Sequence, residues 1–410
     1  MTRRVVVTGM AGITALGGEW PQIERRMRAG ETGTRYIKEW DKLGDLSCKV
    51  GAPADWFRHE GFYPRQKIRS MGRVSVMAVD SVERALTNAG LLNDPVLKSG
   101  RAGVACGSSF GSTPPIRDFV AFLETGKAGA LNATSYIRMM SHTTPVNISV
   151  TFGLTGRVIT TSSACTSGSQ GVGYGYETIQ ANAADIMIVG GSEEFCPTMA
   201  MVFDRLYATS VGANDTPEQA CKPFDATRDG MVVGEGAGFL ILEEREHALA
   251  RGATPLAEVV GYATNADGAH ISHPELGTQV RVMRQALETA NIDKEQVGFI
   301  SGHGTATVAG DVVESQATRE TYGEAVPFHT LKGHFGHSLG ACGGIEAWLG
   351  VEMLRAGWIA PIANFREKDP RCADLDYVGA GGRKIEADYF VSNNFAFGGI
   401  NTSLVFRRAA

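Results

Sequence analysis

Short apolar runs alternate along the chain with segments in which apolar residues recur at helical spacing. Several of the short runs are apolar without alternation, as expected of strands buried on both faces of a sheet. The alternation predicts a layered α/β fold. Strand-like runs occupy residues 4–8, 102–106, 158–161, 186–189, 239–242, 257–262, 297–300 and 403–406, and helix-like segments occupy 74–89, 173–181, 280–290, 311–322 and 345–354.

Glycine clusters at the predicted ends of strands, as in G-S-S-F-G-S at 107–112 and F-G-G-I-N at 397–401. Such clusters permit tight turns and a close approach of the backbone to a ligand. None of them matches the phosphate-binding loop G-x-x-x-x-G-K-[ST], and no G-x-G-x-x-G opens a helix after the first strand. A nucleotide cofactor is therefore not indicated.

A charged segment near residues 245–256 separates two strand-rich halves. The chain has 410 residues, and this is long for one core, since a domain typically has ~150 residues. We therefore expect one half at residues 1–250 and a second at 251–410. The strand–helix rhythm resumes in the second half, which hints at an ancient duplication.

Composition narrows the class of protein. The 43% hydrophobic and 20% charged residues are typical of a globular protein, and the net charge of −5 argues against general nucleic-acid binding. The seven cysteines are odd in number and form no C-x-x-C pair, which favours a reducing compartment over a disulfide framework or zinc site. No signal-peptide pattern is present, and no apolar run approaches the ~20 residues needed to span a bilayer. We expect a cytoplasmic protein that binds neither nucleic acid nor membrane.

Cys165 stands in T-T-S-S-A-C-T-S-G-S-Q-G, where a β-branched run ends and a helical segment begins. A thiol at a helix N-terminus lies near the positive end of the helix dipole, which lowers its pKa. The small neighbouring residues leave room for a substrate. A buried core thiol is nevertheless the commoner role of a cysteine, so this segment alone does not decide between the two.

Histidines in the second half of the chain favour a nucleophilic role for Cys165 over the role of a core thiol. His303, in S-G-H-G-T-A-T, follows a predicted strand, and K-G-H-F-G-H-S-L-G carries Lys332 and His337. Ligands of layered α/β folds gather beyond the carboxyl ends of the strands. One cysteine with histidines distant in sequence is a layout of covalent thiol catalysis.

A metal site is the competing interpretation of these histidines. His329, His334 and His337 do not have the H-E-x-x-H spacing, no carboxylate lies at ligand spacing, and Lys332 would repel a cation. We therefore expect no metal.

Four motifs resemble those of the β-ketoacyl-[acyl carrier protein] synthases, most closely the type II elongating enzymes of fatty-acid and polyketide synthesis. They are S-A-C-T-S-G, G-H-G-T-A-T, K-G-H-F-G-H-S-L-G-A-C-G-G and N-F-A-F-G-G-I-N, and the resemblance covers nearly the whole chain in the family's order. It implies a thiolase-like, duplicated α-β-α-β-α fold with mixed five-stranded sheets, with the cysteine in the first half and the histidines and lysine in the second. It also implies decarboxylative Claisen condensation of malonyl-[acyl carrier protein] with an acyl group on Cys165, in fatty-acid, polyketide or polyene elongation.

The resemblance further implies roles for individual residues. Cys165 would accept the acyl group, and His303 and His337 would act on the malonyl thioester. Lys332 would pair with Glu314, and Phe397 would gate the acyl pocket, its backbone N–H forming an oxyanion hole with that of Cys165. No cofactor is implied, since the substrates are carried on phosphopantetheine. The remaining residues at matching positions are the supporting Asp311 and the phosphopantetheine-binding Thr305, Thr307 and Ser272.

Three positions depart from the family pattern. Ala396 and Ile400 stand where F-G-F-G-G-T-N has glycine and threonine, which is expected to stiffen the gate. Phe110 stands near the expected floor of the acyl pocket, where a smaller aliphatic residue is usual, although ordinary core packing would also explain it. The pattern predicts a primer pocket that is short, or reshaped for a flat or unsaturated chain.

The resemblance also implies protein partners. A basic cluster of Arg65, Lys67, Arg69 and Arg73, with Arg205 elsewhere, is expected to dock an acidic acyl carrier protein, although charge runs are often only solvated surface. Residues 134–141 match a segment that crosses the family's dimer interface. The partner there is either a second copy or a paralogous chain-length subunit.

Three other functions fit these residues less well. A non-catalytic chain-length subunit would lack the nucleophile, whereas Cys165, His303 and His337 are retained. A thiolase acting on coenzyme A esters needs a second cysteine in a C-x-G motif, which Cys372, in R-C-A-D, does not supply. A cysteine hydrolase would not explain the lysine and the second histidine.

Overall fold

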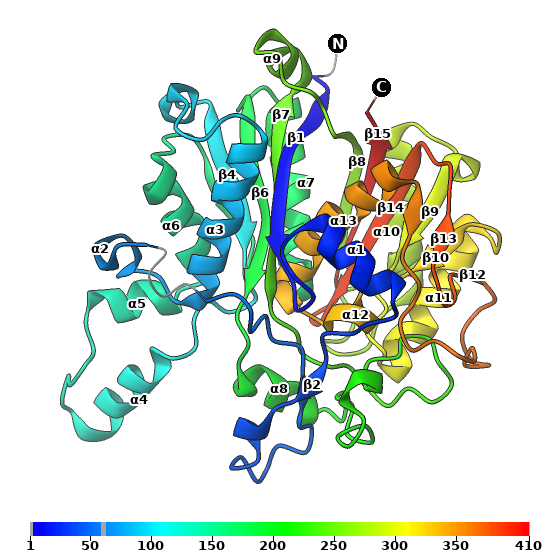
Figure 1. The fold of residues 1–410 in the computed structure, drawn as a ribbon, viewed down its shortest axis with the longest axis horizontal. Helices are drawn as coiled ribbons and strands as arrows, with labels where there is room; N and C mark the ends of the chain where they lie inside the picture. The colour runs from blue at the N-terminus through cyan, green and yellow to red at the C-terminus, as the bar shows by residue number, and fades with distance from the viewer. Residues whose placement is uncertain (1–2, 59–62, 410) are drawn as a thin grey trace.

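A mixed sheet of eleven strands forms the centre of the protein in this computed structural model, which describes residues 3–58 and 63–409 (Figure 1). Two short ribbons pair β2 (Arg35–Tyr36) with β3 (Val50–Gly51) and β11 (Trp358–Ile359) with β13 (Arg383–Lys384). The strands of the large sheet are, in spatial order, β12 (Asp376–Tyr377), β10 (Pro327–His329), β9 (Val297–Ser301), β14 (Tyr389–Ala396), β15 (Ile400–Arg408), β8 (Ala257–Ala266), β1 (Val5–Ile13), β7 (Gly236–Glu244), β6 (Ile186–Glu193), β4 (Ala102–Gly107) and β5 (Val158–Thr160).

The two halves of this sheet repeat one topology. In the first half, β1 is antiparallel to β7 and β7 to β6, while β6, β4 and β5 run parallel. In the second half, β8, β15, β14, β9 and β10 follow one another in the same order and directions. The halves meet where β1 pairs antiparallel with β8. The expected duplication of mixed five-stranded sheets is therefore confirmed, with β12 added at one edge.

Helices form layers on both sides of the strands. α7 and α13 pack against each other and against β6, β7 and β14, and α3 and α10 cover β1 and β8 from the other side. No described helix combines the length and apolar content needed to cross a membrane. The helices are α1 (Trp20–Arg28), α2 (Arg65–Ile68), α3 (Arg73–Asn88), α4 (Ile116–Thr125), α5 (Ala133–Met139), α6 (Thr143–Phe152), α7 (Ser167–Gln180), α8 (Pro197–Asp204), α9 (Arg245–Ala250), α10 (Leu276–Ala290), α11 (Val308–Tyr322), α12 (Lys332–Phe335) and α13 (Cys342–Ala356).

The contact between α7 and α13 depends on glycine. A Cβ atom at Gly168 would lie 2.7 Å from the backbone nitrogen of Gly344 and 3.0 Å from the carbonyl oxygen of Gly340. Both are main-chain atoms that cannot swing aside, so the two helix starts approach as closely as they do only without a side chain at Gly168. This contact fixes the position of Cys165, which lies just before α7.

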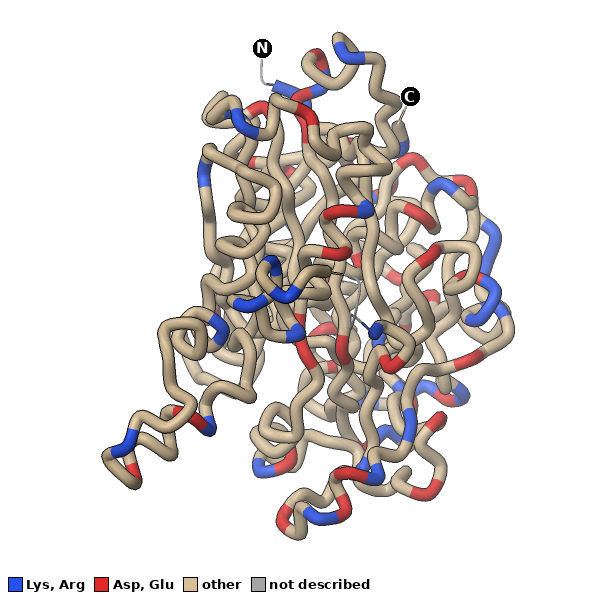
Figure 2. The backbone as a smooth tube through the Cα atoms, turned by 60° about the vertical axis from the view of Figure 1, so that its left-hand side comes forward, with Lys and Arg blue, Asp and Glu red and all other residues tan. Residues whose placement is uncertain are grey.

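An arm made of α4 and α5 projects from the rest of the molecule (Figures 1 and 2). No residue of α4 is buried in the described chain, although Val120, Phe122 and Leu123 are apolar. The arm therefore carries apolar surface that the chain does not cover by itself.

Each predicted strand and helix is present, although most extend further than expected. β14 was not predicted, because it buries the polar side chains of Ser392, Asn393 and Asn394 and so lacks the expected apolar run. The exposed helices α4 and α5 were not predicted either.

Candidate active site

The turn between β5 and α7 positions Cys165. A 3-10 turn, Ala164–Thr166, leads directly into α7, so the cysteine lies at a helix start as expected. Ala164 has a φ of +52°, a left-handed conformation that is disfavoured by about 1–2 kcal/mol for a residue with a Cβ. The Ser167 hydroxyl, which donates to the Ala164 carbonyl at 2.7 Å, helps to hold this turn.

His337 points at Cys165. Its Nε2 lies 3.0 Å from Cys165 Sγ, and its Nδ1 accepts the backbone N–H of Leu339 at 3.3 Å. Because Nδ1 is an acceptor, the proton of the neutral ring is on Nε2. The ring therefore presents an N–H donor to the space around Cys165.

His303 has the same tautomer for a different reason. Its Nδ1 lies 3.1 Å from Nζ of Lys332 and 3.3 Å from Nδ2 of Asn394, and both of these nitrogens can only donate. The proton of His303 is therefore also on Nε2. Burial and the Lys332 charge hold the pKa of His303 and that of His337 well below the usual histidine value, so both rings are neutral.

Lys332 pairs with Glu346, and the expected ion pair with Glu314 is wrong. Both members of the Lys332–Glu346 pair are buried, and the other Glu346 oxygen accepts Nδ2 of Asn394 at 2.6 Å. Burial alone would lower the pKa of Lys332, but Cys342 and Glu346 raise it above its ordinary value. The lysine is therefore a fixed cation behind His303.

Glu314 and Asp311 support the main chain around His303. Glu314 accepts the backbone N–H groups of His303 and Gly304, and Asp311 accepts those of Phe224 and Ala306. Burial raises the pKa of Glu314 to about 8 and that of Asp311 to about 6. Arg228 lies 3.2 Å from Asp311 and stabilises its charged form. The two acids thus hold the loop that carries His303.

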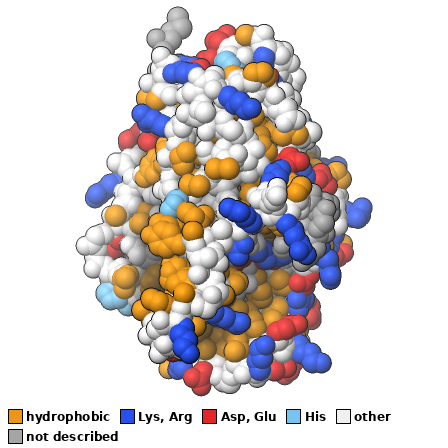
Figure 3. All heavy atoms as spheres, turned by 90° about the vertical axis from the view of Figure 1, so that its left-hand side faces the viewer, with side chains coloured by type: hydrophobic (Ala, Val, Ile, Leu, Met, Phe, Trp, Pro, Cys, Tyr) orange, Lys and Arg blue, Asp and Glu red, His pale blue; other side chains and the backbone are white. Residues whose placement is uncertain are grey.

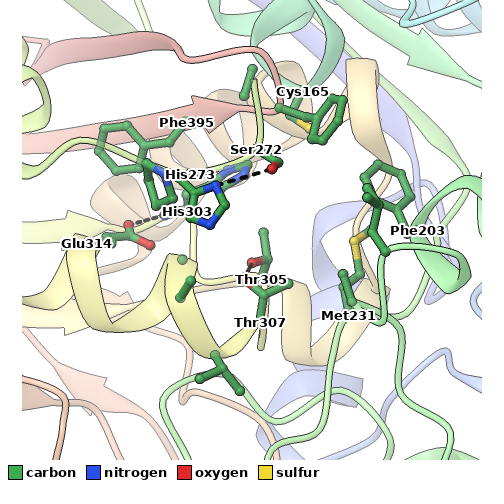
Figure 4. Close-up of a pocket in the computed structure, with 18 of the residues that line it drawn as sticks. Cys165, Phe203, Met231, Ser272, His273, His303, Thr305, Thr307, Glu314 and Phe395 are labelled. Atoms are coloured by element: carbon green, nitrogen blue, oxygen red, sulfur yellow. Dashed lines mark hydrogen bonds between the residues drawn. The ribbon is translucent and has the colours of Figure 1, made fainter. Parts of the chain in front are cut away.

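A cavity of about 400 Å³ connects these residues to the surface. Phe203 and Met231 lie across it from His303 (Figure 4). Thr305 and Thr307 are in contact through their hydroxyls at 2.9 Å and lie, like Ser272, on the cavity wall. The sequence-predicted residues that line the cavity are Cys165, His303, His337, Thr305, Thr307, Ser272, Glu314 and Phe397.

The Cys165 thiol has a raised pKa, and the expectation of a lowered one is wrong for the free protein. Burial raises the pKa to about 11, against the opposing effects of the Phe397 backbone N–H and the Lys332 charge. The backbone N–H groups of Phe397 and of Cys165 itself each lower the pKa, but by less than burial raises it. This is the pair expected to form an oxyanion hole. Burial at 4% exposure outweighs the helix terminus.

Family models match both halves of the chain. The model described as "Beta-ketoacyl synthase, N-terminal domain" matches residues 2–248, and "Beta-ketoacyl synthase, C-terminal domain" matches residues 256–366. The chain belongs to the β-ketoacyl synthase family.

The synthase is 35% identical over 409 residues to 3-oxoacyl-[acyl-carrier-protein] synthase 1 of Escherichia coli K12, covering 99% of each chain. It is 33% identical over 412 residues to 3-oxoacyl-[acyl-carrier-protein] synthase 2 of Synechocystis, covering 99% of this chain and 98% of that one.

Solved structures agree with this membership. A β-ketoacyl synthase from Burkholderia phymatum STM815 superposes on the synthase with a TM-score of 0.98 at 50% identity, over 100% of both chains. The ishigamide ketosynthase/chain length factor superposes with a TM-score of 0.90 at 31% identity, again over 100% of both chains. These similarities confirm the resemblance and the fold predicted from the sequence.

Phe110 and the predicted docking residues do not line the cavity. Phe110 is 43% exposed on the loop after β4 and does not line the cavity, so its expected place in the acyl pocket is wrong for this cavity of the synthase. Arg65, Lys67 and Arg69 are exposed on and beside α2, and Arg205 pairs with Asp45 at 3.2 Å. Each of these four cations lies outside the cavity lining.

Sequence reasoning missed Asn394 and Glu346. Asn394 opens the N-F-A-F-G-G motif, but its buried side chain touches both Glu346 and His303 only in the folded protein. Glu346 lies one turn into α13 and carries no motif signal of its own. The metal interpretation of His334 fails, since both of its ring nitrogens face backbone carbonyls, of Glu31 and Pro361, at 3.0 Å.

Proposed function

We propose that the synthase condenses malonyl-[acyl carrier protein] with an acyl group carried on Cys165, with loss of CO2, and releases 3-oxoacyl-[acyl carrier protein]. The convergence of two neutral imidazoles, each with its proton on Nε2, beside a cysteine in one cavity supports this proposal. A hydrolase would need only one of these histidines, and a chain-length subunit would need neither.

In the first step, the Cys165 sulfur attacks the carrier-borne acyl thioester. A new thioester forms on Cys165, and the carrier leaves as its free thiol with the proton lost by Cys165. The tetrahedral intermediate carries an oxyanion, for which the N–H groups of Cys165 and Phe397 are the proposed donors. The thiol is protonated in the resting protein, so it becomes a nucleophile only as the proton departs.

In the second step, the malonyl thioester enters and its carboxylate leaves as CO2. The electrons of the broken C–C bond form an enolate, whose oxygen accepts the Nε2–H groups of His303 and His337. Preorganised donors of this kind contribute roughly 3–4 kcal/mol each to transition-state stabilisation. The role of Lys332 and Glu346 is to keep His303 neutral and oriented.

In the third step, the enolate carbon attacks the acyl-Cys165 carbonyl. The tetrahedral intermediate collapses, Cys165 leaves as a thiolate and takes up a proton, and the 3-oxoacyl chain stays on the carrier. The steps need no metal or redox cofactor. Thr305, Thr307 and Ser272 offer hydroxyls to the phosphopantetheine arm along the cavity wall.

We also propose that the synthase works as a dimer in the cytoplasm, divided into halves at residue 250, between α9 and β8. The structures of relatives include a ketosynthase bound to its acyl-carrier protein and ketosynthase/chain length factor pairs. Hydrophobic side chains gather in the lower half of the face that carries α4 and α5 (Figure 3). Leu123 on α4 and Val150 on α6 are largely exposed in the single chain.

The test is to incubate the synthase with malonyl-carrier and a panel of acyl-carriers and to follow the products by mass. Condensation should require Cys165, and Cys165→Ala should abolish it while leaving the histidines able to decarboxylate malonyl-carrier. Elongation by Cys165→Ala would show that the nucleophile is elsewhere.

A further inference from the structure

Tyr207 occupies a position that usually belongs to glycine. At the end of α8, the Ala208 N–H donates to the Phe203 carbonyl at 2.9 Å and the Tyr207 N–H donates to the Asp204 carbonyl at 3.0 Å. These two bonds define a Schellman motif, whose left-handed residue is commonly glycine. That residue here is Tyr207, with a φ of +53°. A bulky side chain in this conformation is strained.

The surrounding main chain imposes the strained conformation. Ala208 accepts the Met231 N–H at 2.8 Å, and Ser210 donates to the Met231 carbonyl at 2.9 Å. On the other side, the Asp204 carboxylate accepts the backbone N–H groups of Ser47 and Cys48. The Tyr207 side chain is 95% exposed, so it adds little to the packing that holds this turn. Strain that persists without a structural benefit points to a function.

The Tyr207 side chain lies at the entrance of the catalytic cavity, within a ring of exposed apolar residues. We call Leu206, Tyr207, Ile271, Val308 and Phe397 the apolar collar; all five line the cavity and all are exposed. They come from four separate segments: the turn after α8, the loop after β8, the start of α11 and the loop after β14. These segments, distant in sequence, meet at this entrance.

The charges at the entrance do not suit an acidic surface. Among the described residues that line the cavity, none is a lysine or arginine, whereas Asp229 and Asp267 are present. Arg205, next to the collar, is paired with Asp45. A partner that rests here is therefore bound through apolar contact and not through basic side chains.

We propose that the apolar collar, with Tyr207 as its anchor, binds the acyl carrier protein through the carrier's apolar side chains around its phosphopantetheine attachment site. The inference rests on the proposed function. Cys165 is buried, so the arm reaches it through the cavity while the carrier itself stays at the entrance. Aromatic anchors surrounded by smaller apolar residues are typical of the centres of protein interfaces. Binding of the carrier to this collar depends weakly on salt.

The experiment measures acyl loading onto Cys165 from an acyl-carrier and from the small thioester of N-acetylcysteamine. Tyr207→Gly should raise the KM for the carrier by about thirtyfold, the loss typical of removing a hot-spot residue from an interface. The loss with the small thioester should be several times smaller. Tyr207→Phe should restore binding, because the ring and not the hydroxyl makes the contact. Leu249→Ala, an exposed leucine on α9, is the matched control.

Thermal unfolding separates binding from folding. Tyr207→Gly relieves the left-handed strain and should melt no lower than the parent protein, although it binds the carrier less well. A KM for the carrier within twofold of the parent value would overturn the proposal. A steep rise of KM with salt, with the loss carried by alanine variants of Arg65, Lys67 and Arg69, would also overturn it. If the parent synthase loads from neither thioester, the proposed function fails instead.

Discussion

Nζ of Lys332 lies 3.1 Å from Nδ1 of His303, so a fixed cation lies directly behind an imidazole that faces the cavity. The ammonium group donates a hydrogen bond to Nδ1, so the ring proton is on Nε2, toward the cavity. The positive charge also opposes protonation of the ring, and Glu346 neutralises the lysine on its far side. One ion pair thus sets both the tautomer and the charge of His303.

Removing this ion pair should move the pH dependence of catalysis. In Lys332→Met/Glu346→Gln both charges are lost, which avoids leaving one unpaired charge buried. Since the Lys332 charge lowers the pKa of His303, its removal should raise that pKa. In the proposed mechanism neutral His303 is the active form, so the acid limb of malonyl decarboxylation should shift to higher pH, as measured by CO2 release.

The single variant Lys332→Met is the comparison for this prediction. It leaves the Glu346 carboxylate buried without its cation and should lower the free energy of unfolding by about 3–5 kcal/mol. An unchanged acid limb in the double variant would show that Lys332 does not control the protonation of His303.

The raised pKa of Cys165 predicts a thiol that reacts slowly with alkylating agents at neutral pH. Because the pKa is about 11, raised chiefly by burial, the sulfur is protonated at neutral pH. The rate of alkylation of Cys165 by iodoacetamide should keep rising above pH 9 and reach half of its maximum only near pH 11. Mass spectrometry of the modified peptide measures this rate, and Cys165→Ala gives the background. A midpoint below pH 9 would contradict the dominance of burial.

Cys165, His303 and His337 could be predicted from the sequence because each lies in a motif at the end of a strand. The ends of neighbouring strands meet in space, so residues far apart in the chain were expected to converge. The position of a motif at the end of a strand does not show in which direction a long side chain points. Glu314 and Glu346 are both buried acids on helices near the site, and only the fold shows that Lys332 turns toward Glu346.

The burial or exposure of individual side chains could not be predicted from the sequence either. The helix start that carries Cys165 is readable from its residues, but the burial that raises the cysteine pKa depends on packing from distant segments. Asn394 lies on β14, which was not predicted because its buried polar residues interrupt the apolar pattern of a strand. Conversely, Tyr207 resembles any surface tyrosine until its φ and its position at the cavity become known.

The close contact between α7 and α13 predicts a large effect of a small substitution. Gly168→Ala would push a methyl group against the main chain of Gly344, and overpacking of this kind lowers the free energy of unfolding by about 1–3 kcal/mol. Chemical denaturation measures the change. The matched control is Gly277→Ala near the start of α10, where a Cβ atom meets open space, so this variant should be neutral or stabilising by up to about 1 kcal/mol.

The uncovered apolar surface of the α4–α5 arm predicts that a single substitution there separates the subunits. Leu123 on α4 is 80% exposed in the single chain, and an aspartate at this position would carry a charge into any interface that covers it. Leu123→Asp should shift the protein from dimer to monomer in sedimentation velocity without changing its circular dichroism. Leu249→Asp, on the distant α9, should leave the dimer intact. If Leu123→Asp remains dimeric, the two subunits meet through a different face.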